Sequence, residues 1–281
     1  MRVFNNKLYG GTYNTGNLLE WNETDAWVQK APKSGSETYI FALCELNGKL
    51  YGSTYPDGKL LEWNGSNAWV QKAPQLGSVT HIWSLCEFNG KIYGGTYPDA
   101  LLYEWNGVNL WVEKAPQLDA EDYIYSLVEF DGKLYGGTST NGLLYEWNGS
   151  NAWVEKAPQH NSETAIHSLA VFDSKLYGGT YPNGNLVEWN GSNAWVEKAP
   201  QLGAETYIYS LAVFDSKLYG GTGENGKLYE WNDVDAWVEV ASKLGTATQI
   251  MCMAVFESGL FGGASNTGQL LQLCSQSLVE E

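Results

Sequence analysis

The feature that most constrains this chain is a strict internal repeat of 42 residues. An aromatic residue followed by two small residues recurs at this spacing at Tyr9, Tyr51, Tyr93, Tyr135, Tyr177, Tyr219 and Phe261. Two tryptophans and one isoleucine keep the same step in six units each, without insertion or deletion. Such a period is typical of repeat folds, in which each unit buries its apolar faces against its neighbours.

Each unit predicts four short β-strands. In one unit they are Ile208–Phe214, Lys217–Thr222, Lys227–Trp231 and Ala236–Val240, and we name these four positions A, B, C and D. The runs are rich in aromatic and β-branched residues and are separated by turn residues, whereas no stretch shows helical periodicity. The sequence therefore predicts an all-β fold built from four-stranded antiparallel sheets.

A ring of such sheets is the expected arrangement. A single four-stranded sheet exposes two apolar faces, and stacking the sheets in a ring covers both and leaves only short edges. We expect one β-propeller domain over residues 1–281 of the chain. Its approximate blade units are 1–32, 33–74, 75–116, 117–158, 159–200, 201–242 and 243–281.

The two ends of the chain decide between seven blades and six. Seven complete units need slightly more than the 281 residues present, and the shortfall falls at the termini. Met1–Phe4 matches the second half of an A strand, Gln269–Leu273 matches a C strand, and Leu278–Glu280 is a weak D strand. We expect seven blades, with a shortened inner strand at one end and a weak outer strand at the other. Six blades is the alternative, if one terminal unit is unpaired.

The unit resembles the kelch repeat. A kelch blade has an apolar inner strand, an aromatic residue with two glycines in the second strand, an aromatic residue in the third and a tryptophan opening the fourth. Here these features are Ile124–Phe130, Tyr135–Gly137, Trp147 and Trp153, and the resemblance covers the whole chain. It implies a propeller with a scaffold function, as in most members, or oxidase or isomerase-type chemistry, as in a few.

Composition and charge exclude several partners. The chain carries 32 acidic and 16 basic residues, a net charge of −16 without a basic stripe, so we expect no nucleic-acid binding. No apolar run approaches the roughly 20 residues that cross a bilayer, so we expect no membrane partner. Four cysteines are sparse for a disulfide framework, and Cys44 and Cys86 occupy one core position in neighbouring units. We expect a cytoplasmic protein, with an extracellular location as the alternative.

Antiparallel strands fix which loops share a face. The D–A and B–C loops emerge together, and the A–B and C–D loops emerge on the opposite face. The units differ most on the D–A/B–C face, in the residues that flank the A-strand isoleucine and open the B–C loop. The candidate ligand-binding residues there are Tyr39, Phe41, His81, Trp83, Tyr123, Tyr125, His167, Tyr207, Tyr209, Tyr13, Tyr55, Tyr97 and Tyr181. Nearby acidic residues are Glu37, Glu121, Asp122, Glu163 and Glu205.

These residues predict a ring of aromatic side chains edged by carboxylates. Tyrosine and tryptophan give a large contact area at low entropic cost, so such a ring suits protein or sugar ligands. The alternative is that the aromatic residues only cap the core between blades.

Evidence for metal binding or catalysis is weak. Glu45, Glu87 and Glu129 occupy one position in three consecutive A strands and are a weak candidate cation site; alternatively, they lie at the solvated mouth of the channel. The three histidines occupy different positions in their units, and no nucleophile–base motif is present. We therefore expect no catalytic residue and no cofactor.

Several functions remain open at this point. The leading hypothesis is a monomeric, non-catalytic scaffold that binds protein or peptide partners through the D–A/B–C face. A multivalent lectin with repeated pockets between blades is the second hypothesis. A propeller enzyme with a site at the channel mouth and a recently amplified array without a function of its own are further alternatives. A lectin predicts equivalent pockets between most blades, whereas a protein binder predicts one asymmetric patch.

Overall fold

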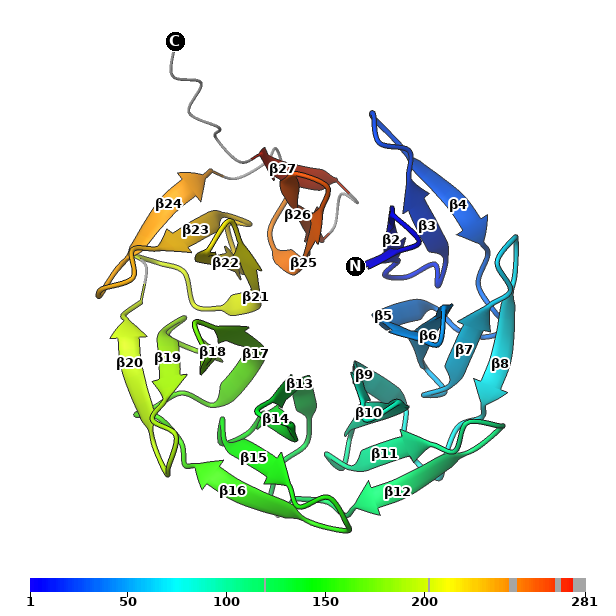
Figure 1. Ribbon diagram of the computed structural model, residues 1–281, viewed down its shortest axis with the longest axis horizontal. Coiled ribbons are helices and arrows are strands. Elements are labelled where there is room, and N and C mark those ends of the chain that lie inside the picture. The colour runs from blue at the N-terminus through cyan, green and yellow to red at the C-terminus, as the bar shows by residue number, and fades with distance from the viewer. Residues whose placement is uncertain (119, 202, 243–246, 266–268, 275–281) are drawn as a thin grey trace.

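The chain forms a ring of seven β-sheets around a central channel (Figure 1). The computed structural model describes residues 1–118, 120–201, 203–242, 247–265 and 269–274. Six sheets have four antiparallel strands and one has three within these residues, and each sheet is built from one contiguous stretch of chain. The predicted seven-bladed, all-β propeller is confirmed. The described residues contain no helix long and apolar enough to span a membrane.

Each blade runs from the channel to the rim in the order A, B, C, D (Figure 1). The A strands are β1 (Arg2–Phe4), β5 (Tyr39–Leu46), β9 (His81–Phe88), β13 (Ile124–Phe130), β17 (Ala165–Phe172), β21 (Ile208–Phe214) and β25 (Ile250–Phe256). The B strands are β2 (Lys7–Gly11), β6 (Lys49–Tyr55), β10 (Lys91–Tyr97), β14 (Lys133–Thr138), β18 (Lys175–Tyr181), β22 (Lys217–Thr222) and β26 (Gly259–Ala264). The C strands are β3 (Leu18–Trp21), β7 (Leu60–Trp63), β11 (Leu102–Trp105), β15 (Leu144–Trp147), β19 (Leu186–Trp189), β23 (Leu228–Trp231) and β27 (Leu270–Cys274). The D strands are β4 (Trp27–Ala31), β8 (Trp69–Ala73), β12 (Trp111–Ala115), β16 (Trp153–Ala157), β20 (Trp195–Ala199) and β24 (Trp237–Ala241).

In the sixth blade the C and D strands start one residue later than predicted, and local hydrogen bonds explain both shifts. The N–H of Lys227 donates to Thr222 Oγ1 at 3.1 Å, and its carbonyl accepts from the N–H of Thr222 at 3.0 Å, so Lys227 closes the B–C loop. The N–H of Ala236 donates to Asn232 Oδ1 at 3.0 Å, so Ala236 belongs to the C–D turn. In this turn the asparagine side chain supplies the acceptor that a backbone carbonyl would otherwise provide. The first inner strand and the last C strand also start one residue later than predicted, at Arg2 and Leu270.

Neighbouring blades are joined through the A-strand isoleucine and the second small residue of the B strand. A Cβ at Gly95 would lie 2.6 Å from Cγ2 of Ile124 in the next blade and 2.6 Å from Ser84 Oγ, so glycine fits beside this serine. In the second blade the pair is reversed, with Ser53 on the B strand and Ala42 on the A strand. Beside Gly95, Ser84 Oγ donates a hydrogen bond to the carbonyl of Ile124 at 3.0 Å. Ser168 and Ser210 make the same bond to the isoleucine of the next blade. The repeated isoleucine is therefore the contact that sets the blade spacing.

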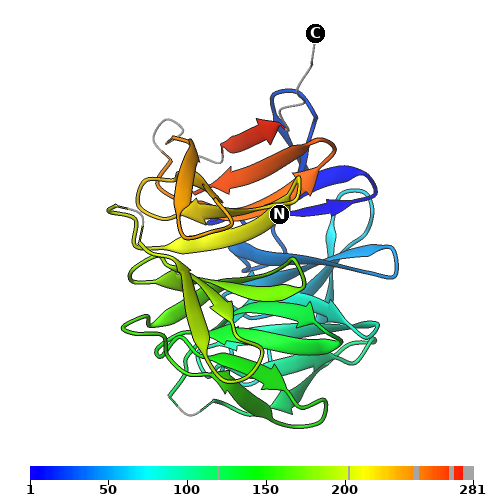
Figure 2. The ribbon, with the colours of Figure 1, turned by 60° about the vertical axis from the view of Figure 1, so that its left-hand side comes forward.

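The first and last blades meet at a seam, and within the residues described no strand of one blade pairs with the sheet of the other. β1 has only three residues and pairs with β2, which confirms the shortened inner strand. β1 and β2 lie beside β25 in both views of the ring (Figure 2). Leu8, Phe256 and Phe261 form the buried cluster at this seam. The predicted outer strand of the last blade, Leu278–Glu280, lies outside the described residues.

Candidate binding face

All thirteen candidate aromatic residues lie in one connected network of ring contacts at the D–A/B–C end of the channel. The network begins with Tyr13, whose ring centroid lies 4.2 Å from that of Tyr39. It continues through Phe41 and Trp83, whose rings stack at 4.5 Å. It passes through the remaining blades and ends at Tyr209. The structure therefore brings together every residue of the predicted set.

A β-bulge in each complete inner strand helps to form the network. The pairing of β13 with β14 shifts between Ile124 and Ser126, so Tyr125 is the extra residue of a bulge. The same shift in the next two blades places His167 and Tyr209 at bulges. Bulges commonly redirect a side chain next to a functional site. Here Tyr125 stacks on His167 at 4.2 Å.

A second layer of rings bridges neighbouring blades further from the channel axis. Tyr97 at the end of β10 stacks on Tyr123, which precedes β13, at 4.0 Å. Tyr181 at the end of β18 stacks on Tyr207 in the same way at 3.9 Å. The B–C loop of one blade is thus packed against the D–A loop of the next, which agrees with the predicted sharing of faces.

The network is half-buried and uncharged at neutral pH. Tyr13 is 64% exposed, and the other twelve residues are only partly exposed. Burial lowers the pKa of His81 to about 4 and that of His167 to about 3, so both imidazoles are neutral. Burial also raises the pKa of Tyr125 to about 12. The face therefore offers ring edges, hydroxyls and neutral imidazoles to a partner.

The prediction that carboxylates edge this ring is wrong for four of the five acidic residues. Glu37, Glu121, Glu163 and Glu205 are 0–2% exposed, and only Asp122 is exposed. They hold the D–A loop against the B–C loop of the same blade. For example, Asn141 Nδ2 donates to Glu121 Oε1 at 2.6 Å, and Lys59 Nζ lies 2.8 Å from Glu37 Oε1. A buried carboxylate needs hydrogen-bond or ion-pair partners. These side chains find their partners in the neighbouring loop and therefore point into the protein rather than towards a ligand.

The aromatic network is an arc rather than a closed ring. Gln249, Met251 and Ser265 stand in the seventh blade where other blades carry aromatic residues. Gln249 Nε2 instead donates to the hydroxyl of Tyr209 at 3.2 Å and ends the arc. In the first blade the inner strand begins at Arg2, so it contributes only Tyr13. The arc is therefore one asymmetric patch.

The weak candidate cation site at Glu45, Glu87 and Glu129 is not supported. Within the described part of the chain, no group of three or more His, Cys, Asp or Glu side chains is placed to hold a metal ion. The three residues lie on separate inner strands and are partly or fully exposed. Glu87 accepts a hydrogen bond from the N–H of Gly90 in its own A–B turn at 2.7 Å, so it stabilises the turn.

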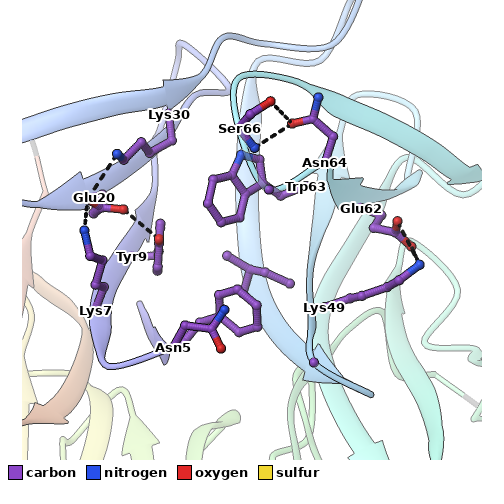
Figure 3. Close-up of a pocket in the computed structure, with 14 residues that line it drawn as sticks. Asn5, Lys7, Tyr9, Glu20, Lys30, Lys49, Glu62, Trp63, Asn64 and Ser66 are labelled. Carbon is purple, nitrogen blue, oxygen red and sulfur yellow. Dashed lines mark hydrogen bonds and ion pairs between the residues drawn. The ribbon is translucent and has the colours of Figure 1, made fainter.

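A second set of candidate sites lies between blades on the A–B/C–D side. The sequence analysis did not name the residues of these sites. A cavity of about 650 Å³ between the first and second blades is lined by Lys7, Tyr9, Glu20, Lys30 and Trp63, among others (Figure 3). A cavity of about 450 Å³ between the third and fourth blades is lined by the equivalent residues Lys91, Tyr93, Glu104, Lys114 and Trp147. The signal was present in the sequence, because these residues recur in step with the repeat.

Comparisons with known proteins show the fold alone. No family model matches the chain, and no curated protein matches it. Among solved structures, the WD40 β-propeller domain of Doa1 matches with a TM-score of 0.74 at 15% identity, over 99% of this chain and 92% of that one. A chain of the mitotic checkpoint complex matches with a TM-score of 0.74 at 14% identity, over 98% and 89%. The RRP9 WD40 repeats match with a TM-score of 0.66 at 13% identity, over 92% and 84%. Two of these three neighbours are described as WD40 propellers and none as a kelch propeller, so kelch membership is not shown.

Proposed function

We propose that this protein is a non-catalytic scaffold that binds a protein or peptide partner through the aromatic arc. The observation that carries the proposal is the arc itself, which joins thirteen rings over six blades and stops before the seventh. Rings that are already packed on one another lose little side-chain entropy on binding, so their contact area converts efficiently into affinity. The kelch resemblance implies a scaffold function, which agrees with this proposal. The fold shared with WD40 propellers is also consistent with it.

The charge of the chain indicates the chemistry of the partner. The net charge is −16, and the exposed Asp122 lies beside the arc. Basic side chains are attracted by this field and can also lie over tyrosine and tryptophan rings. We therefore propose a partner segment that carries lysine or arginine together with apolar residues.

Binding, rather than catalysis, also fits the two histidines of the arc. General acid–base catalysis is most efficient when the pKa of the group lies near the working pH. Burial holds the pKa of His81 at about 4 and that of His167 at about 3, so neither is matched to proton transfer near neutral pH.

A displayed peptide library selected on the wild-type protein tests the proposal. We expect enriched peptides with basic residues, whose affinity falls about 30-fold or more when Trp83 or Tyr125 is replaced by alanine, since losing a central aromatic anchor costs about 2 kcal/mol. Val108→Ala is the matched control, because Val108 is 69% exposed in a C–D turn on the opposite face. Equal capture by wild type, Trp83→Ala and Tyr125→Ala, with the fold intact by circular dichroism, would contradict the proposed surface.

A second candidate function is multivalent binding of sugars between blades. It is favoured by the two equivalent cavities on the A–B/C–D side, which are lined by the same residue types from different blades. This face is opposite the aromatic arc, so the two functions are independent and can be tested separately.

A further inference from the structure

Five of the seven blade interfaces carry the same set of five side chains. Each set comprises a B-strand lysine and tyrosine, a C-strand glutamate and a D-strand lysine from one blade, and the C-strand tryptophan of the next blade. The sets are Lys7, Tyr9, Glu20, Lys30 and Trp63; Lys49, Tyr51, Glu62, Lys72 and Trp105; Lys91, Tyr93, Glu104, Lys114 and Trp147; Lys133, Tyr135, Glu146, Lys156 and Trp189; and Lys175, Tyr177, Glu188, Lys198 and Trp231.

The geometry of the set is the same at all five interfaces. Both lysine Nζ atoms lie 2.8–3.5 Å from the glutamate oxygens. The ring centroids of the tyrosine and the tryptophan are 5.1–5.4 Å apart. The set is therefore a repeated structural unit, and the two cavities described above are two copies of it.

The remaining two interfaces lack this unit. Between the sixth and seventh blades, Val240 replaces the second lysine and Leu273 replaces the tryptophan. At the seam, Gly259, Phe261 and Gln272 replace the lysine, the tyrosine and the glutamate. The number of complete sites per chain is therefore five.

Each unit has more hydrogen-bond donors than acceptors. Burial alone raises the pKa of Glu20, but hydrogen bonds from Tyr9, Lys7 and Lys30 outweigh this effect and hold the pKa below its usual value, so the group is a carboxylate. Its oxygens already accept from Tyr9 at 2.6 Å and from Lys7 at 2.9 Å, and Lys30 lies 3.1 Å away. Each ammonium has three donors and uses one here. Two ammoniums and one carboxylate leave a charge of +1, and Lys7 is 47% exposed.

The wall opposite the lysines is aromatic. Trp63 packs against Tyr9 and Phe4 across the interface, and the backbone of the turn Asn64–Ser66 continues the wall (Figure 3). A ligand that fits this cavity therefore has two features. It has several acceptor oxygens for the lysines, and it has a ring that packs against aromatic carbon.

We propose that each of the five units binds one acidic sugar residue, a pyranose that carries a carboxylate. The carboxylate pairs with the two lysines, and the hydroxyls accept from their spare N–H groups. The ring lies against Trp63, which is partly exposed, and at the other four units against the edge of a tryptophan that is 4–8% exposed. Cavities of about 450 and 650 Å³ fall within the usual range for small-ligand sites. The net charge of −16 disfavours long polyanions, whereas a single acidic residue meets mainly the local +1. This inference rests on the second candidate function and specifies its ligand.

Isothermal titration of the full chain with methyl β-D-glucuronide tests the inference, with methyl β-D-glucoside and sodium acetate as comparison probes. We expect five glucuronides per chain and affinities at least tenfold lower for the other two probes. Equal affinity for glucuronide and glucoside would overturn the acidic preference and leave the second candidate function standing. Equal affinity for acetate would show a simple anion site, and no binding of any probe at millimolar concentration would overturn the inference. The scaffold proposal is unaffected by all of these outcomes, because it concerns the other face.

Removing one site gives a second, internal test. Lys91→Gln combined with Lys114→Gln keeps a donor at each position but removes the charge, and we expect the stoichiometry to fall from five to four. Lys217→Gln is the matched control, because Lys217 occupies the same position at an incomplete interface. A stoichiometry that remains five in the double variant, or that falls in the control, would overturn the assignment of the sites.

Discussion

At the scale of single residues, the same side-chain type has two different environments in this molecule. Tyr93 is 3% exposed and donates a hydrogen bond to Glu104 at 2.7 Å, while burial and this bond raise its pKa strongly. Tyr97, four residues later, is partly exposed and stacks on a ring of the next blade. Position along the B strand therefore separates tyrosines that hold the interface from tyrosines that form the arc.

The buried histidines make stability depend on pH. An unfolded histidine has a pKa near 6.5, whereas burial lowers the pKa of His81 to about 4 and that of His167 to about 3. As pH falls below 6.5, the unfolded state gains protons that the folded state does not, so stability is lost progressively towards pH 4. We expect wild type to lose about 3–4 kcal/mol more than a His81→Phe, His167→Phe double variant between pH 7 and pH 5, which is about 2 kcal/mol for each histidine.

Urea unfolding at pH 7, 6 and 5 measures this difference. The phenylalanines keep the ring contacts but do not titrate, and the carboxylates common to both proteins cancel in the comparison. Parallel loss of stability in wild type and the double variant would show that the two imidazoles are already protonated in the folded protein near pH 6.

At the scale of strands, much of the structure could be predicted from the sequence. The A strand Ile208–Phe214 and the B strand Lys217–Thr222 have the predicted bounds, because turn residues and apolar periodicity mark both ends. The bulge after Ile208 could not be predicted, since pairing register depends on the partner strand. The burial of Glu121 was also missed, because its partner Asn141 is distant in sequence and meets it only when the two loops fold together.

The glycine pair of the B strand gives a prediction about strand packing. A Cβ at Gly179 would lie 2.6 Å from Ile208 Cγ2 and 2.7 Å from Ser168 Oγ, whereas one at Gly178 would have its nearest contacts at 3.2 Å. We expect Gly179→Ala to lower the free energy of unfolding by about 3 kcal/mol or more and Gly178→Ala by about 1 kcal/mol, because overpacking cost rises with the displacement required. Urea midpoints of the two variants measure the contrast, and equal effects would mean that Ile208 moves away at little cost.

At the scale of the whole molecule, the two faces differ in symmetry. The D–A/B–C face carries one continuous arc that spans the first six blades, whereas the A–B/C–D side repeats one unit at five interfaces. A single arc suits one extended partner, and repeated units suit several copies of a small ligand, where linked sites gain avidity. Both features stop before the seventh blade, so this blade limits both proposed sites.

The seam also determines where the ring is weakest. Among the described residues, its buried cluster comprises Leu8, Phe256 and Phe261, against which partly buried side chains such as Trp21 and Leu270 pack. The three-residue β1 supplies the inner strand on one side. In repeat architectures stability is approximately a sum of unit and interface terms, so opening begins at the weakest interface. We expect the backbone amides of β1 and β25 to exchange with solvent faster than those of β13 and β17.

Phe261→Ala tests this order of opening. Phe261 is 4% exposed, and its truncation leaves a cavity that costs about 3–5 kcal/mol at the seam. We expect exchange to accelerate in β1, β2, β25 and β26 while β13–β16 on the opposite side of the ring keep their protection (Figure 1). Hydrogen exchange followed by mass spectrometry reports each blade separately. Uniform acceleration in all seven blades would instead mean that the ring opens as one cooperative unit and that the seam is not its weakest interface.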